Sequence, residues 1–333
     1  MGVHLKLIFL AACALAVTFP VTVCTANDAA KSSEGAELLA KASLLQNISE
    51  KGSQPFLLRM HVHAEHVVTR PVDGAYEEVW MAPDKWRREI SFPGFTQTEV
   101  GDTDSKWLIR NSQFRPRAVY LTAIAVEAFL SPHLQFEEKI ASVRTRKIKG
   151  IEARCVELLG KERAHGRDLC FDATGLLLME STRNKRFEYA DFDKFNGKFF
   201  PKSIRVYEDD SKVLEITADD LGAPHEPQPE MFQHQPDARQ MAPCELWPAD
   251  ATKKIPPEYP PAARNIHQQG TVTLYALLSG DGTVSKTSVL TSASSTLDQS
   301  AVDAVKQWLF PPAACGAIPL NSEVEIQINY QLR

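Results

Sequence analysis

The sequence lacks the residues and patterns on which several classes of protein depend. Its 333 residues hold 37 basic and 42 acidic side chains, so the net charge of -5 gives no positive surplus that would favour nucleic acid or an anionic surface as a partner. It contains no glycine-rich phosphate loop, no His-Glu-x-x-His zinc motif and no Gly-x-Ser-x-Gly nucleophile elbow. It also lacks the internal repeats that build solenoids or propellers. We therefore expect a non-catalytic protein that needs no cofactor.

Histidine is concentrated in residues 60–66, which contain His61, His63 and His66. In an extended strand His61 and His63 share one face, whereas His66 lies on the other. A zinc site needs three or four converging ligands, so we expect these histidines to be solvated and to bind no metal.

Long apolar runs are missing except near the start of the chain. Residues 7–17 are apolar, His4 and Lys6 precede them, and Pro20 ends the run before the small residues Cys24 and Ala26. This order predicts a secretory signal peptide over residues 1–26. We expect cleavage after Ala26, because the peptidase pockets accept only small side chains.

Two other interpretations of this segment stay open. The sequence Leu-Ala-Ala-Cys that ends at Cys13 has the form of a lipidation site, but the apolar run continues beyond it. Residues 5–23 are an alternative inner-membrane anchor, although a membrane-spanning helix needs about 20 apolar residues and Pro20 interrupts these.

Cysteine is scarce, and its use agrees with export. Removal of the signal leaves Cys155, Cys170, Cys244 and Cys315, an even number that suits an oxidising compartment. Cys155 and Cys170 flank residues 161–167, which have the composition of a hairpin turn, so we expect them to face each other across two strands and form a disulfide. Cys244 and Cys315 would then form a second bridge. The alternative is four free thiols.

The chain length favours two domains, and the composition changes once between them. Residues 223–244 are rich in proline, glutamate, glutamine and histidine and contain few apolar side chains. We predict a linker over residues 223–253, which separates a first domain at residues 27–222 from a last domain at residues 254–333.

The first domain is predicted to be rich in strands. Residues 35–46 have helical spacing, and most of residues 56–219 alternate between apolar and polar side chains as strands do. Residues 118–130 interrupt this pattern with an apolar helix, and Asn196 and Gly197 form a hairpin turn. These features predict an α+β fold in which one large antiparallel sheet curls around its helices.

Two phrases within these strands resemble a known family. Residues 78–87 read Glu-Val-Trp-Met-Ala-Pro-Asp-Lys-Trp-Arg, and residues 192–204 contain a Gly-Lys-Phe-Phe-Pro turn. With the leading helix and the long antiparallel strands, they make residues 35–222 similar to the LolA/LolB superfamily of periplasmic lipoprotein carriers. The resemblance implies a curved half-barrel, plugged by helices, that shelters acyl chains and is lined by Trp80, Trp86, Phe92 and Phe187. The alternative is that these four residues fill an ordinary core.

Residues 254–333 contain the most ordered pattern in the chain. Residues 270–277 alternate as a strand, Asp281 and Gly282 form a turn, and residues 284–290 return as a second strand. Ser294 and Ser295 cap a helix whose apolar face ends at Trp308. Residues 322–332 then alternate as a last strand, so the predicted order is ββαβ.

This order resembles the C-terminal domain of the TonB family. The residues that match the family pattern are Tyr259, Pro260, Ala263, Gly270, Val272, Asp281, Gly282, Val284, Leu297, Asp298, Ala301, Trp308, Phe310, Pro312, Ala313, Gly316 and Pro319. The resemblance implies a periplasmic module that recognises an outer-membrane transporter by adding a strand to a sheet edge. We expect the partner to contact the lead-in and the last strand, at Tyr259, Pro260, Val324, Glu325, Ile326, Gln327, Ile328, Asn329 and Tyr330.

The two resemblances lead to one main hypothesis and one alternative. The main hypothesis is a non-catalytic periplasmic protein that docks to a TonB-dependent outer-membrane transporter, or to another envelope protein, in TonB-linked transport. The alternative is a periplasmic carrier for the acyl chains of a lipid or lipoprotein. A full energy transducer of the TonB family has an uncleaved N-terminal helix and a long proline-rich spacer, and here a folded domain and a short linker stand in their place.

Overall fold

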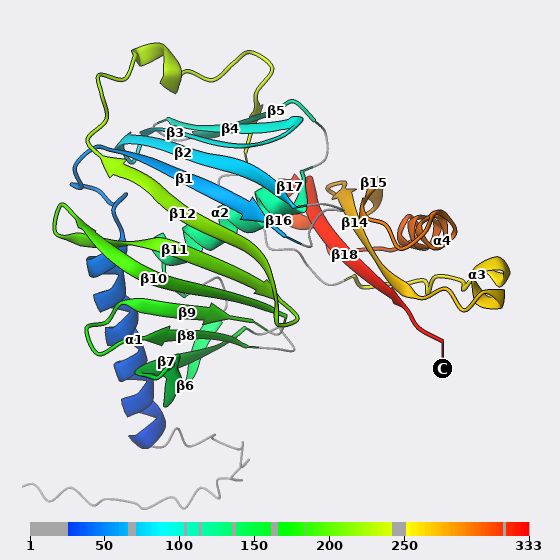
Figure 1. Cartoon of the computed structure of the whole chain (residues 1–333), viewed down its shortest axis with the longest axis horizontal. Coiled ribbons are helices and arrows are strands. Elements are labelled where there is room, and N and C mark those ends of the chain that lie inside the picture. Colours follow the sequence, from blue (N-terminus) through cyan, green and yellow to red (C-terminus); the bar gives the residue numbers. More distant parts are fainter. Residues whose placement is uncertain are drawn as a thin grey trace, which may run out of the picture.

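The computed structural model describes residues 26–65, 71–102, 105–112, 115–134, 138–160, 166–182, 184–241, 251–315 and 318–332. These residues form two domains, each with its own apolar core (Figure 1). The signal peptide expected over residues 1–26 lies almost entirely outside the described residues. Among the helices that are described, none has the length and the hydrophobicity needed to cross a membrane.

The first domain, here called the sheet domain, is built on one antiparallel sheet of 13 strands in the order β13-β5-β4-β3-β2-β1-β12-β11-β10-β9-β8-β7-β6. The strands are β1 (Phe56–Ala64), β2 (Val72–Ala82), β3 (Lys85–Phe92), β4 (Phe95–Asp102), β5 (Ser105–Arg110), β6 (Glu138–Ile148), β7 (Ile151–Gly160), β8 (Arg167–Phe171), β9 (Leu177–Ser181), β10 (Lys185–Phe195), β11 (Lys198–Glu208), β12 (Ser211–Gly222) and β13 (Arg239–Gln240). Since β13 and β6 remain unpaired edges of the described sheet, the sheet is open and not closed into a barrel. The predicted antiparallel α+β fold is confirmed.

Alternating side chains give the sheet one buried face. In β1 the residues Phe56, Leu58, Met60, Val62 and Ala64 are at most 2% exposed, and the side chains between them point to the other face. The same alternation in the neighbouring strands builds a continuous core on the concave side of the sheet.

Two helices fill this concave side. α1 (Ala26–Gln46) packs on β6 and β11, and α2 (Arg117–Leu130) packs on β3, β11 and β12. α2 is apolar on most of its surface, with Leu121 and Phe129 completely buried. Gln46, at the end of α1, donates to the carbonyl oxygen of Phe129 at 3.0 Å and accepts from the amide of Leu177 at 2.5 Å. α1, α2 and β9 are thereby tied together at one point.

Two boundaries differ from the expectation. α1 begins at Ala26, well before residue 35. The segment predicted to be a linker contains η1 (Pro229–Phe232) and β13, which pairs with β5. Its proline content predicted irregular structure, but burial of Phe232 and stacking of His234 on Trp107, with ring centroids 3.8 Å apart, hold it against the sheet.

The second domain, residues 251–332, has the predicted ββαβ order with a short hairpin added before the last strand. Its elements are α3 (Pro261–Asn265), β14 (Gly270–Leu278), β15 (Val284–Thr291), α4 (Ser295–Val305), β16 (Ala313–Cys315), β17 (Ile318–Leu320) and β18 (Ser322–Tyr330). The long strands lie in the order β15-β14-β18. Ser294 caps α4 by accepting a hydrogen bond from the amide of Leu297. Gly282 adopts a φ of +82°, and a Cβ there would lie 2.0 Å from the carbonyl oxygen of Phe310, so the turn requires glycine.

Cys155 and Cys170 form the predicted disulfide. They are register partners on β7 and β8, and both are completely buried. Cys244 lies outside the described residues, so the second bridge, to Cys315, stays a prediction.

We expect loss of the Cys155–Cys170 bridge to destabilise the sheet domain. The bridged residues are 15 positions apart, and a cross-link over such a loop stabilises by about 3 kcal/mol because it limits the unfolded chain. The Cys155→Ala/Cys170→Ala variant should lower the free energy of unfolding of the sheet domain by about 2–4 kcal/mol in urea, followed by circular dichroism. An unchanged sheet-domain transition would contradict this.

Candidate functional site

β18, the strand expected to bind the partner, is an edge strand. Within the described residues it pairs with β14 alone, and β15 forms the opposite edge. Val324, Ile326 and Ile328 are buried in the core of the C-terminal domain, and the alternate side chains project from the other face. Figure 1 shows β18 between the two domains, with its beginning close to the sheet domain and its end projecting away from it.

The first outward carboxylate, Glu323, is held by three arginines of the sheet domain. Arg110 donates to its two oxygens at 2.9 and 3.4 Å, and Arg239 donates to it at 2.6 Å. Arg115 lies 3.6 Å away. The Arg110 and Glu323 side chains are only 8% and 14% exposed, so this two-pronged contact is largely withdrawn from water and fixes the orientation of β18.

The second outward carboxylate, Glu325, shares a buried guanidinium with the sheet domain. Arg117, the first residue of α2, is 5% exposed and forms ion pairs with both Glu325 and Glu208 of β11. With its amide oxygen turned toward Arg117, Gln327 accepts from that guanidinium at 2.7 and 2.9 Å. Arg117 therefore joins α2, β11 and β18. We call the four residues that receive β18, Arg110, Arg115, Arg117 and Arg239, the cationic dock.

Burial and charge act on the two carboxylates with different results. Burial opposes ionisation of Glu323, but the positive charges of Arg110 and Arg115 outweigh it and lower the pKa of Glu323 to about 2. Burial raises the pKa of Glu325, because the charges of Arg117 and Lys185 only partly offset the loss of water and the nearby charge of Glu208 adds to the rise. Glu323 is therefore the ionised anchor of the contact.

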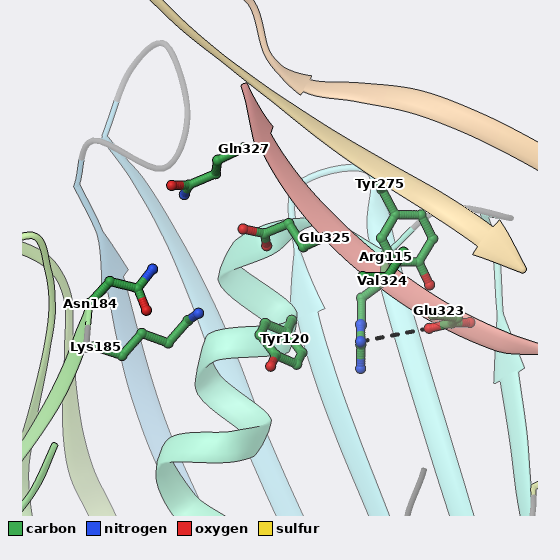
Figure 2. A pocket seen from close by; sticks show the side chains of 9 residues that line it. All are labelled: Arg115, Tyr120, Asn184, Lys185, Tyr275, Glu323, Val324, Glu325 and Gln327. Carbon is green, nitrogen blue, oxygen red and sulfur yellow. Dashed lines mark ion pairs between the residues drawn. The ribbon is translucent and has the colours of Figure 1, made fainter. Parts of the chain in front are cut away.

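A pocket of about 260 Å³ lies where the domains meet (Figure 2). It is lined by Arg115, Tyr120, Asn184 and Lys185 of the sheet domain and by Tyr275, Glu323, Val324, Glu325 and Gln327 of β14 and β18. Figure 2 shows the side chain of Lys185 directed from the sheet domain into the space below Glu325. Charged groups surround this space, so it suits water or a small polar group and not an acyl chain.

The second half of β18 is more open. Gln327 and Asn329 are exposed, whereas Glu323 and Glu325 are half-buried against the cationic dock. Because no described strand covers the edge of β18 away from β14, residues 327–330 present an accessible strand edge.

Tyr259 and Pro260, also expected to contact the partner, lie at the end of β18. The ring of Tyr259 meets that of Tyr330 edge-on, with centroids 5.6 Å apart, and its hydroxyl donates to the carbonyl oxygen of Gln268. Pro260 is half-buried beside a groove of about 530 Å³ along α4. The structure therefore brings the expected partner-binding residues together on one side of the C-terminal domain.

The four aromatic residues expected to line a lipid cavity belong to the core of the sheet domain. Trp80, Trp86, Phe92 and Phe187 are at most 9% exposed. Trp86 lies so close to Gly101 that a Cβ there would meet its ring at 2.0 Å. α2 packs into the same core, so a lipid-lining role stays a prediction and requires this core to open.

The histidines of β1 behave as surface residues. His61 and His63 lie on the outer face and contact Asp73 at 3.2 and 2.7 Å, and His66 lies outside the described residues. In the part of the chain that the structure describes, no three His, Cys, Asp or Glu side chains gather as a metal site.

The cationic dock is the part of the site that sequence analysis missed. Arg110 ends β5 and Arg117 begins α2, positions that have no regular spacing to β18. The one available signal was the alternation in β18, which places Glu323 and Glu325 on the same face. That pattern implies a basic surface opposite the strand but does not say where in the chain it lies.

We expect the stabilisation by Glu323 to disappear in acid. Its pKa falls from 4.5 to about 2 on folding, so its contribution is complete above pH 4.5 and is lost as the pH falls toward 2. The difference in free energy of unfolding between wild type and Glu323→Gln should be about 3 kcal/mol at neutral pH and should shrink across that window. Urea denaturation between pH 2 and 7 measures it.

The matched control for this measurement is Glu77→Gln. The Glu77 carboxylate pairs with Arg59 at the surface, with side chains 37% and 53% exposed, so this variant should resemble the wild type at every pH. A Glu323→Gln difference that stays constant from pH 7 to pH 2 would refute the assignment of Glu323 as the ionised anchor.

The C-terminal domain matches a known family. Residues 255–332 match the family model described as Gram-negative bacterial TonB protein C-terminal. Over 86 residues the chain is 35% identical to protein TonB of Vibrio cholerae serotype O1. This match covers 26% of the chain, and it spans only 35% of the length of the Vibrio protein.

Solved structures similar to the sheet domain were also found. A LolA superfamily protein from Nitrosomonas europaea is 13% identical, with a TM-score of 0.42, over 61% of this chain and 98% of that one. A DUF1329 family protein from Desulfovibrio piger is 12% identical, with a TM-score of 0.43, over the same shares of the two chains. The match over residues 255–332 confirms the predicted resemblance of the C-terminal domain to the TonB C-terminal family. For the sheet domain, a LolA superfamily protein is among the similar solved structures.

Proposed function

We propose that this protein docks to an outer-membrane transporter, or to another envelope protein, in TonB-linked transport, and that it does so by pairing a strand of the partner with the edge of β18. The observation that carries the proposal is an accessible strand edge in a domain that matches the TonB C-terminal family. An edge strand presents backbone donors and acceptors that a partner strand satisfies whatever its side chains are.

β18 is better suited to this role than the opposite edge, β15. The inward side chains of β18, among them Ile326, Ile328 and Tyr330, are buried, so its backbone is held by the core while its outer edge remains open. β15 has no fully buried residue. A strand that is already rigid loses less conformational entropy when a partner pairs with it.

The proposed setting is the periplasm. The predicted signal peptide would direct the chain there, and the buried disulfide between Cys155 and Cys170 suits an oxidising compartment. Pairing of strands needs no catalytic group, so the protein acts in this proposal by binding alone.

We expect partner peptides to protect the edge of β18 from hydrogen exchange. The probes are synthetic peptides that cover the N-terminal segments of TonB-dependent transporters from the same genome. At about ten times the Kd of a binding peptide, amides at alternate positions of residues 327–330 should exchange about tenfold more slowly. Exchange in β15 should not change.

The matched test uses photo-crosslinking from the two edges of the same sheet. A benzoylphenylalanine at the position of Asn329, on β18, should crosslink the peptide, whereas one at the exposed position of Ser285, on β15, should not. Crosslinking from Ser285 only, or peptide binding without protection of β18, would show that the partner uses a different surface.

A second candidate function is transport of acyl chains. It is favoured by the packing of the apolar α2 on β3, β11 and β12, in the same core that contains Trp80 and Phe187, because displacement of α2 would open an interior with aromatic walls. Native mass spectrometry of detergent-free protein, before and after incubation with phospholipid vesicles, should then show an added mass of one lipid. Protein that stays free of ligand in both samples would rule the carrier out.

A further inference from the structure

In the proposed function, β18 contacts the cationic dock of the sheet domain and also pairs with a partner strand. These two contacts cannot both extend over the whole strand. Glu323 and Glu325, in its first half, are half-buried on the cationic dock. In its second half Gln327 also reaches Arg117, but Gln327 and Asn329 are exposed. Figure 1 places that first half on the side of the C-terminal sheet that faces the sheet domain. A strand added at the edge of β18 therefore meets the sheet domain as soon as it extends beyond residues 327–330.

We infer that the structure shows a closed state, in which the cationic dock restricts access to β18, and that full pairing of a partner with β18 releases the C-terminal domain and loosens α2. This inference rests on the proposed function, since it concerns regulation of the same strand. It adds a second consequence, the loosening of α2, that partner binding alone does not require.

The first step of the argument is the length of the open edge. Strands in proteins average about five to six residues, and a shorter pairing gives little stability. β18 runs over nine residues, and the outward carboxylates of its first half, Glu323 and Glu325, contact the sheet domain. Glu323 and Glu325 hold this half of β18 beside the sheet domain (Figure 1), so a partner strand of ordinary length along its edge meets the sheet domain unless these contacts to the arginines open. The dock and the partner therefore compete for the space beside β18.

The second step is the link from β18 to α2. Arg117 is the first residue of α2, and two of its three acceptors, Glu325 and Gln327, are on β18. If β18 moves away from the sheet domain, the Arg117 guanidinium keeps Glu208 and loses the other two of these three acceptors. A guanidinium that is 5% exposed is stabilised by full pairing, so its loss weakens the attachment of the first turn of α2.

The third step is the chemistry of the contact. Ion pairs cross the domain interface beside a pocket of about 260 Å³ that charged residues line, and the two apolar cores remain separate. Such a contact opens without exposing a large apolar surface, and water can solvate the charges that separate. Coupling of this kind is reciprocal: if a partner strand loosens α2, then loosening of α2 favours the partner.

The experiment weakens the dock without altering β18. Arg110→Gln removes the two-pronged contact with Glu323, and Arg115→Gln/Arg239→Gln removes its two other cations, both of which are more exposed and therefore safer for folding. The matched control is Arg144→Gln, which removes an arginine of β6 that pairs with Asp168 away from β18. Hydrogen exchange of the full chain is measured in β18 and α2, together with the affinity for the transporter peptides.

We expect both dock variants to exchange faster than the wild type in the first half of β18 and in the first turn of α2. Their affinity for a transporter peptide should rise by about 5- to 150-fold, the range typical of coupled sites. Arg144→Gln should match the wild type in all three measurements.

Two results would overturn the inference. Faster exchange in β18 with unchanged exchange in α2 would show that α2 is not coupled, and unchanged peptide affinity in a variant whose β18 is released would show that the dock does not restrict access. If no peptide binds any form, the proposed function fails. In that case joint acceleration in β18 and α2 still supports the closed state, and acceleration in β18 alone still refutes it.

Discussion

The guanidinium of Arg117 is the interaction on which the relation of the two domains depends. It is buried where α2 begins, and its acceptors come from β11 on one side and β18 on the other. Leaving a buried charge without its partner costs about 3–5 kcal/mol. For that reason α2 and the C-terminal domain keep their positions together, and any process that moves one must provide new acceptors or water for this group.

The same constraint explains why a charged strand faces the chain's own sheet domain. An uncovered edge strand is a template for pairing with any other edge, which makes it an aggregation hazard. Glu323 and Glu325 hold β18 against arginines of the sheet domain, and in the closed state that we infer this contact is the cover that a partner replaces. An apolar cover would hold the strand more firmly, but its removal would expose a sticky surface to water. In the inferred closed state, a cover made of charged side chains therefore protects the edge of β18 and can still open for a partner strand.

Much of the C-terminal domain was predictable because its signals act over a few residues. The turn at Gly282, the cap at Ser294 and the alternation in β18 each specify local backbone geometry. The disulfide between β7 and β8 followed from the same kind of local pattern. The cationic dock was not predictable, because Arg110 and Glu323 are joined only after two domains have folded. The pairing of β13 with β5 was not predicted for the same reason. The composition of residues 223–244 describes that segment alone and does not show which sheet edge it packs against.

The filled interior of the sheet domain also bears on the choice between docking and carrying. Val119, Leu121, Val126, Phe129 and Leu130 of α2 are buried, and each such side chain stabilises by about 1.5–3 kcal/mol, so together they hold α2 by about 8–15 kcal/mol. An acyl chain of about 14 carbons gains about 11 kcal/mol on burial, at about 0.8 kcal/mol for each CH₂. An acyl chain, the cargo in the carrier alternative, would therefore nearly match α2 in apolar energy. A few kcal/mol would then decide between them, and the ion pairs that hold Arg117 at the start of α2 favour α2 by an amount of that size.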